Sequence, residues 1–244
     1  MSARLTLVTA ARVLRQLQHD RRTLALLLIV PLILLGLLAW IYSGTEVFDR
    51  IGGPLLGVFP FLVMFLVTSI ATLRERQSGT LERLLTMPMG KADLVGGYAL
   101  AFGGLAGVQA VLAATFALTV LGLDVAGPPW LLVVVAVVVA LLGTALGLFL
   151  SAFAATEFQA VQFLPAFVLP QFLLCGLLVP RAELPTVLSY VSDALPLSYA
   201  IDAMRSITTS ASPVGDVTTD VAIVTGFVVA LVSLGAATLR RRTA

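Results

Sequence analysis

Long stretches without any charged residue alternate with short polar segments along this chain. They cover residues 24–42, 51–73, 94–123, 125–156, 158–180 and 221–239. Each approaches or exceeds the roughly 20 residues that a helix needs to cross about 30 Å of hydrocarbon. Gly127-Pro128-Pro129 is a turn signal, so helices end inside the two longest stretches. The pattern predicts membrane-spanning helices over 24–42, 52–73, 95–120, 130–155, 158–180 and 219–239.

Residues 1–22 have the periodicity of a surface helix instead. The residues sharing its apolar face are Leu7, Ala10, Leu14 and Leu17, and those sharing the opposite, basic face are Arg12, Arg15, His19 and Arg22. We predict an interfacial helix whose basic side meets lipid headgroups. A cleavable signal peptide is not expected, because the apolar stretch that follows is long and no A-x-A site comes after it.

Prolines divide the segment 181–217 between the last two predicted spans. Pro180, Pro185, Pro196 and Pro213 exclude one long helix, yet apolar residues between them keep helical spacing. Helices too short to cross a bilayer must lie in the interface or be buried in protein. Three glycine pairs, Gly53/Gly57, Gly103/Gly107 and Gly143/Gly147, indicate either close helix packing or simply the frequency of glycine in such helices.

Composition and charge place this pattern in a membrane. The chain is 59% hydrophobic and 11% charged, whereas soluble domains are about 45–50% apolar and about 25% charged. Twelve of the fifteen Lys and Arg residues lie in 4–22, 74–91 and 240–242. By the positive-inside rule, both termini and residues 74–91 are cytoplasmic. The fold class is therefore an all-α polytopic membrane protein of six spans, and no nucleic-acid partner is expected.

The residues that carry chemistry in enzymes are scarce. Gly90-Lys91 is no P-loop, because Leu85 replaces the first glycine and Ala92 replaces the hydroxyl residue. His19 and Cys175 have no partners that would make a metal or catalytic site. We expect no enzyme activity, metal or cofactor on this chain, and the charge-free spans argue against an ion-driven mechanism.

The predicted cytoplasmic segment 74–91 has an apolar centre with a charged rim. Leu81, Leu84 and Leu85 lie at i, i+3 and i+4, one face of a short helix. The charged residues around them are Arg74, Glu75, Arg76, Glu82 and Arg83. Such a patch favours docking to a partner. The alternative is that the leucines pack back onto the protein's own helices.

Three segments resemble the ABC-2 type exporter permeases. Residues 74–88, RERQSGTLERLLTMP, resemble that family's R-E-x-…-G-T-L-E-x-L-L-x-x-P signature. Residues 172–180, FLLCGLLVP, resemble its S-G-x-x-x-P helix end, with Cys175 where Ser is frequent. Residues 195–205, LPLSYAIDAMR, resemble L-P-L-T-Y-x-V-D-A-x-R. The order of the segments is similar along the whole chain.

The resemblance implies partners and roles. Two permease copies, expected to be a homodimer, would pair with two separate ATP-binding subunits that hold ATP and Mg. The 181–217 segment would dip back from outside as two short re-entrant helices. The residues implied in ATPase coupling are Glu75, Gly79, Thr80, Leu81, Glu82, Leu84 and Leu85.

A lipophilic drug-like or lipid cargo, exported across the cell membrane, fits the apolar spans. Its path would follow a face shared by two copies, along the first, second and fifth helices. The candidate path residues are Phe61, Phe65, Phe163, Phe167, Phe172 and Leu173, each of which has lipid contact or helix packing as an alternative role. Rival hypotheses are a permease for lipid-linked polysaccharide, an ATP-independent carrier or flippase, and a non-transporting scaffold.

Overall fold

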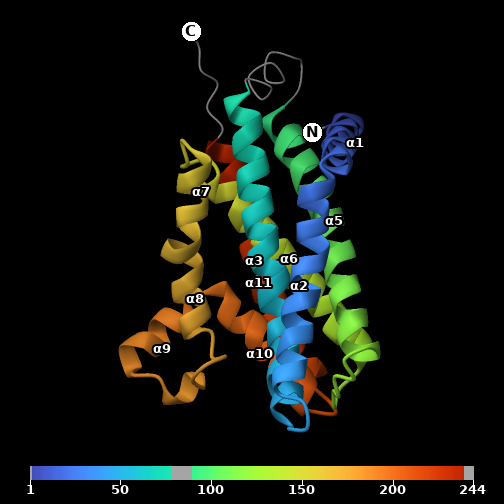
Figure 1. The fold of residues 1–244 in the computed structure, drawn as a ribbon. Coiled ribbons are helices and arrows are strands. Elements are labelled where there is room, and N and C mark those ends of the chain that lie inside the picture. The colour runs from blue at the N-terminus through green and yellow to red at the C-terminus, as the bar shows by residue number, and fades with distance from the viewer. Residues whose placement is uncertain (1, 79–89, 239–244) are drawn as a thin grey trace.

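A computed structural model describes residues 2–78 and 90–238, which contain helices and no strand (Figure 1). The longer helices are α1 (Ala3–His19), α2 (Arg21–Ile41), α3 (Val47–Gln77), α5 (Lys91–Thr119), α6 (Pro129–Leu150) and α11 (Val214–Thr238). The shorter ones are α7 (Glu157–Phe163), a π-helical turn (Leu164–Val168), α8 (Leu169–Leu174), a 3-10 turn (Arg181–Glu183), α9 (Thr186–Asp193) and α10 (Pro196–Thr209). The chain is an all-α bundle.

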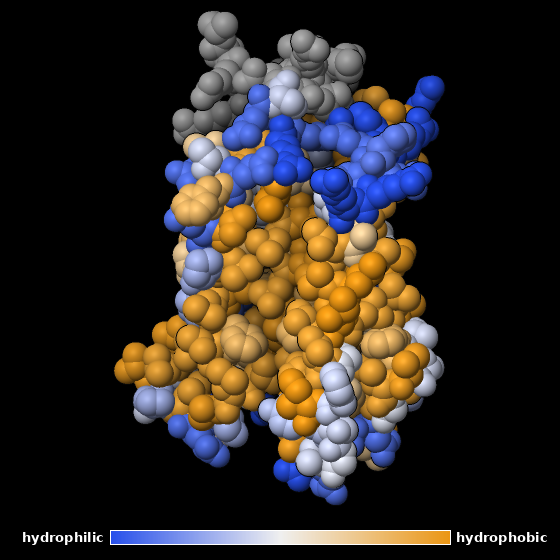
Figure 2. All heavy atoms as spheres, in the orientation of Figure 1, coloured by the Kyte–Doolittle hydropathy of each residue, from blue (hydrophilic) through white to orange (hydrophobic). Residues whose placement is uncertain are grey.

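Five of the described helices are long and apolar enough to cross a membrane: α2, α3, α5, α6 and α11. Figure 2 shows the apolar belt that they form, with hydrophilic residues gathered at its two ends. The protein is therefore a multi-pass membrane protein. The start of α1 and the end of α11 lie at the same end of the bundle, and α8, α9 and α10 lie toward the other (Figure 1).

The fifth predicted span, 158–180, is not a single helix. Pro165 and Pro170 cannot donate backbone hydrogen bonds, and the segment runs as α7, the π-helical turn and α8. Helix α8 ends at Leu174, because Gly176 has a φ of +87°, a left-handed conformation that terminates helices. The prediction of six membrane-spanning helices is thus not confirmed as stated.

The first helix is present, and its buried face includes the predicted Ala10 and Leu17 but not Leu7. Thr6, Thr9 and Val13 are buried along with Ala10 and Leu17, whereas Leu7 is 62% exposed. The buried side packs on α5, where a Cβ at Gly97 would lie 2.5 Å from the Cβ of Thr9. Tertiary packing on α5, rather than hydrophobicity alone, sets which face of α1 is covered.

The centre of the bundle is the contact between α3 and α6. A Cβ at Gly143 would lie 2.3 Å from the carbonyl oxygen of Phe61, and one at Gly147 would lie 2.6 Å from that of Phe65. The 143/147 pair is therefore a true close-packing pair. At Gly107 nothing lies within 4 Å of such a Cβ, so this glycine is not required by packing in the described chain.

Two short helices follow the prolines of 181–217, as predicted, although whether they re-enter the membrane stays a prediction. Arg181 binds Asp193 of α9 and Asp202 of α10, and Arg205 donates to the Gly176 carbonyl. These bonds fasten α9 and α10 to the end of α8. Most of α10 is buried against α3, α6 and α11.

Candidate functional site

The signature of residues 74–88 begins inside α3 and not in a loop. Arg74, Glu75, Arg76 and Gln77 were predicted to lie outside the helix, but α3 runs to Gln77 and has 31 residues. At 1.5 Å per residue it is about 46 Å long, well beyond the hydrocarbon thickness. The last turns can therefore be polar, and each of their four side chains binds another segment of the protein.

Glu75 is the most buried of the four, with 6% of its side chain exposed. Arg12 of α1 binds it with both terminal nitrogens, at 3.2 Å (Nη1 to Oε1) and 3.0 Å (Nη2 to Oε2). Arg12 Nη2 also donates to the Tyr98 hydroxyl of α5 at 3.0 Å. A bidentate guanidinium–carboxylate pair fixes geometry as well as charge. It therefore ties α1, α3 and α5 together.

Arg74 points to another neighbour. It donates from Nε and Nη2 to the two carboxylate oxygens of Glu157, at 2.7 and 3.0 Å. Glu157 is the first residue of α7, so this pair connects α3 to the broken fifth segment. Because both side chains are about half exposed, the pair contributes more to position than to stability.

The last two side chains hold the link between α6 and α7. Gln77 Nε2 donates to the Ala155 carbonyl at 2.8 Å, and Arg76 Nη1 approaches the Ser151 carbonyl at 3.5 Å. We call Arg74–Gln77, with Arg12, Tyr98 and Glu157, the α3 junction. It joins α1, α5 and the α6–α7 link at one end of the bundle, directly before residue 79.

The α3 junction changes how the predicted coupling residues are understood. Glu75 faces inward to Arg12, so it is not available to touch a partner and can act on one only through α1 and α3. Six other predicted residues lie outside the described residues: Gly79, Thr80, Leu81, Glu82, Leu84 and Leu85. Sequence reasoning missed Arg12, Tyr98 and Glu157, because pairs separated by more than 60 positions leave no local pattern.

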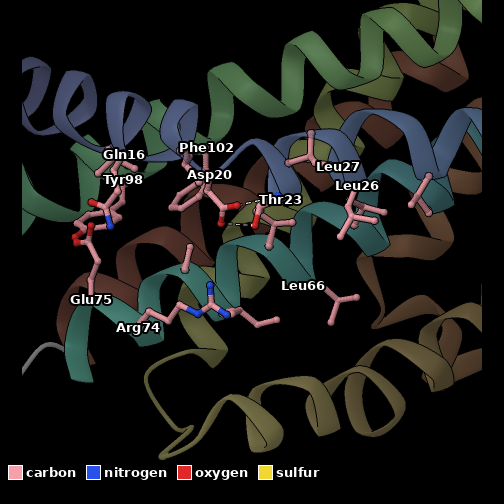
Figure 3. Close-up of a pocket in the computed structure, with 17 residues that line it drawn as sticks. Gln16, Asp20, Thr23, Leu26, Leu27, Leu66, Arg74, Glu75, Tyr98 and Phe102 are labelled. Carbon is pink, nitrogen blue, oxygen red and sulfur yellow. Dashed lines mark hydrogen bonds between the residues drawn. The ribbon is translucent and has the colours of Figure 1, made fainter. Parts of the chain in front are cut away.

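A cavity of about 400 Å³ lies beside the α3 junction, between α1, α2, α3 and α5 (Figure 3). Its apolar walls come mainly from α2 and α3. Its polar lining is Gln16, Asp20, Thr23, Arg74, Glu75 and Tyr98. None of the six predicted path residues lines this cavity.

Asp20 lies between α1 and α2 and caps the start of α2. Its Oδ1 accepts from the Thr23 backbone N–H at 3.1 Å, and its Oδ2 accepts from the Thr23 hydroxyl at 2.6 Å. These hydrogen bonds, that from the hydroxyl most of all, lower the pKa of the Asp20 carboxyl. Asp20 is therefore ionised at neutral pH.

The predicted path residues separate into two groups. Phe61 and Phe65 are fully buried where α3 meets α6. Phe167 and Leu173 are 47% and 48% exposed on the broken fifth segment, and Phe163 and Phe172 are half-buried there. The rings of Phe163 and Phe167 meet edge to face at 5.7 Å. A path along these residues stays a prediction.

Comparison with known proteins agrees with this architecture. Residues 4–209 match the family described as ABC-2 type transporter. The chain is 28% identical over 141 residues to ABC transporter G family member 20 of Dictyostelium discoideum, a match covering 58% of this chain and 19% of that protein. It is 26% identical over 153 residues to the "Probable multidrug ABC transporter permease YbhR" of Escherichia coli K12, covering 63% of this chain and 42% of that one.

The matches thus span less than half the length of the curated relatives. The family match covers most of the chain, from within α1 to the end of α10. It includes both the α3 junction and the short helices α9 and α10. This protein belongs to the ABC-2 type transporter family, as a membrane permease.

Proposed function

We propose that this chain is the permease subunit of an ATP-driven exporter that moves a lipophilic drug-like or lipid substrate outward. A separate ATP-binding subunit, in two copies, supplies the energy from ATP and Mg, and two permease copies pair in the cell membrane. Both termini and residues 74–91 face the cytoplasm. Family membership, the multidrug permease name of a relative and the apolar spans support this proposal.

One observation carries the coupling part of the proposal. The side chains of the signature's first four residues join α3 to α1, α5 and the α6–α7 link immediately before the segment that resembles the family's coupling region. A displacement of residues 79–89 would move α3 as well, because these residues follow the helix directly in the chain. The α3 junction then passes it to α1 and α7 through bidentate ion pairs, which resist both sliding and rotation.

The test is co-expression with candidate ATP-binding subunits, purification in mild detergent and reconstitution into vesicles. We expect an ATPase to co-purify and ATP-dependent movement of a fluorescent lipophilic dye. Dye movement that follows an ion gradient and needs neither ATP nor an ATPase would support the secondary carrier instead. Protein that assembles with the ATPase but exports only lipid-linked glycans would support the polysaccharide alternative.

Leu84→Asp tests the coupling segment itself. A charged residue in an apolar anchor should remove most ATPase co-purification and dye efflux, while the amount of inserted protein stays normal. Ser2→Asp, a charge added in another cytoplasmic segment, is the control. Normal efflux and normal co-purification in the Leu84→Asp variant would show that this segment does not couple the two subunits.

A further inference from the structure

The cavity beside the α3 junction combines apolar walls with an acidic end, and we infer that it is a binding site for a lipophilic cation. The apolar body would lie between α2 and α3, and the positive group would meet the Asp20 carboxylate. Binding at this site does not depend on transport; only the step from bound ligand to exported cargo rests on the proposed function.

The walls suit the apolar part of such a ligand. Side chains from α2 and α3 form them: Leu26, Leu27, Val30, Leu66, Val67 and Ile70. A volume of about 400 Å³ lies within the range of roughly 300–1,000 Å³ typical of small-molecule sites. Figure 3 shows Leu26, Leu27 and Leu66 toward one side and Glu75 toward the other, with Asp20 between them. The cavity is therefore amphipathic along its length.

The charges that line the cavity leave one negative charge unbalanced. Arg74 gives two nitrogens to Glu157, and Glu75 receives two from Arg12, so each is neutralised by its partner. The Asp20 carboxylate accepts hydrogen bonds from Thr23 and forms no ion pair with any described residue. The charge of Arg74, whose guanidinium is bonded to Glu157, acts on it only through space. Asp20 is partly buried, and the apolar walls beside it strengthen the attraction of this carboxylate for a cation.

An anionic amphiphile is the opposing possibility, because Arg21 and Arg22 follow Asp20 in the sequence. Both are exposed, and neither lines the cavity. Their positive charge therefore lies outside the cavity lining, whereas Asp20 is part of it. The observations favour the cation, and the experiment includes an anionic amphiphile as the alternative ligand.

The experiment is equilibrium dialysis of purified full-length protein in phosphatidylcholine nanodiscs, with empty discs subtracted. The probes are decyltrimethylammonium and decyl sulfate, which share a tail and differ in charge. We expect saturable binding of the cation and at least about tenfold weaker binding of the anion. This comparison needs no variant, so a folding defect cannot obscure it.

Three variants localise the binding. Asp20→Asn keeps a side-chain oxygen to cap α2 but removes the charge, and should weaken cation binding about tenfold. Val67→Trp fills the cavity and should abolish saturable binding. Asp216→Asn removes an exposed carboxylate at the start of α11 and should change nothing.

Equal cation affinity in wild type and Asp20→Asn would overturn the inference, as would saturable decyl sulfate binding as tight as that of the cation. Because dialysis involves no ATPase, these results are separate from the fate of the proposed function. If the protein binds the cation but never exports it, the binding site is confirmed and the proposed transport function is contradicted. If the protein exports dye but shows no saturable cation binding in dialysis, only the binding site is contradicted.

Discussion

At the scale of single residues, a polar side chain supplies the hydrogen bond that a proline inside a helix cannot donate. Pro31 lies inside α2 and has no N–H to give to the Leu27 carbonyl four residues earlier. The buried side chain of Gln109, on α5, donates to that carbonyl at 2.9 Å. In a bilayer a freed backbone carbonyl must find such a partner. Gln109 therefore permits Pro31, and it also binds α5 to α2.

Gln109→Leu should lower the free energy of unfolding by about 1–3 kcal/mol, since it leaves the Leu27 carbonyl unsatisfied. The same substitution should cost less than half as much in a Pro31→Ala background, where residue 31 regains an N–H for Leu27. Thermal or chemical unfolding in detergent measures this double-mutant cycle. Equal costs in both backgrounds would mean that Gln109 serves some other purpose.

A second residue-scale prediction concerns Glu75 in the α3 junction. Glu75→Gln should lower stability by about 1.5–3 kcal/mol, because its charged hydrogen bonds with Arg12 are largely shielded from water. It should also reduce ATP-dependent dye efflux while leaving insertion intact. Arg50→Gln is the control, because its pair with Glu46 is 77% and 88% exposed and contributes little. The exchange Arg12→Glu with Glu75→Arg should recover part of the lost stability and efflux. Equal efflux in Glu75→Gln and wild type would show that the α3 junction takes no part in coupling.

At the scale of elements, α3 is the central helix, packed against α6 along one side and joined to α1, α5 and α7 at its polar end. The backbones of α3 and α6 approach so closely that Phe61 and Phe65 have glycines as neighbours. Any movement of α3 must carry α6 with it or open this contact. The exposed face of the broken fifth segment has no comparable constraint.

Gly143→Ala and Gly107→Ala form a matched pair on neighbouring helices. The first places a methyl group against the Phe61 carbonyl and should lower the melting temperature by several degrees, as expected for overpacking of about 1–3 kcal/mol. The second meets no atom within 4 Å and should be neutral, or stabilising by up to about 1 kcal/mol through helix propensity. Melting curves in detergent measure both variants. An unchanged melting temperature in Gly143→Ala would contradict the close approach of α3 and α6 at this glycine.

At the scale of the whole molecule, basic residues are distributed unequally between the two ends. Arg4, Arg15, Arg21 and Arg22 belong to α1 and the start of α2, at the end where α3 finishes (Figure 1). Arg50 and Arg181 belong to the opposite end, near the start of α3 and the end of α8. The positive-inside rule then predicts that the α1 end is cytoplasmic.

Single cysteines placed at Ser2, Ser78 and Thr243 in a Cys175→Ala background should react with an impermeant maleimide only after cells are opened. A cysteine at Thr45, in the exposed turn between α2 and α3, should react in intact cells. The native Cys175 is buried and should be inert. Labelling of the Ser78 variant in intact cells, or of all four variants alike, would refute the orientation.

The sequence by itself determined the membrane class, the presence of five of the long apolar helices and the division of 181–217 into short helices. It could do so because these features depend on local quantities: the length of an apolar stretch, a proline or a run of basic residues. The signature in 74–88 also pointed to the family. The fifth segment was less predictable, because an apolar stretch does not show where a π-helical turn and a left-handed glycine interrupt it.

Only the tertiary structure decided which residues of the candidate site come together. Arg12, Glu75 and Tyr98 are far apart in the chain, so local sequence places Glu75 at a partner's surface, whereas in the structure it binds Arg12. Phe61 and Phe65 looked like path residues because both are large and apolar, a property that core and lipid-facing positions share in a membrane protein. Both are buried, because glycines of α6 let the two helices approach closely at these positions. The physical reason is the same for Asp20: local sequence sets charge and helix propensity, whereas long-range packing sets which charges are paired and which one faces a cavity.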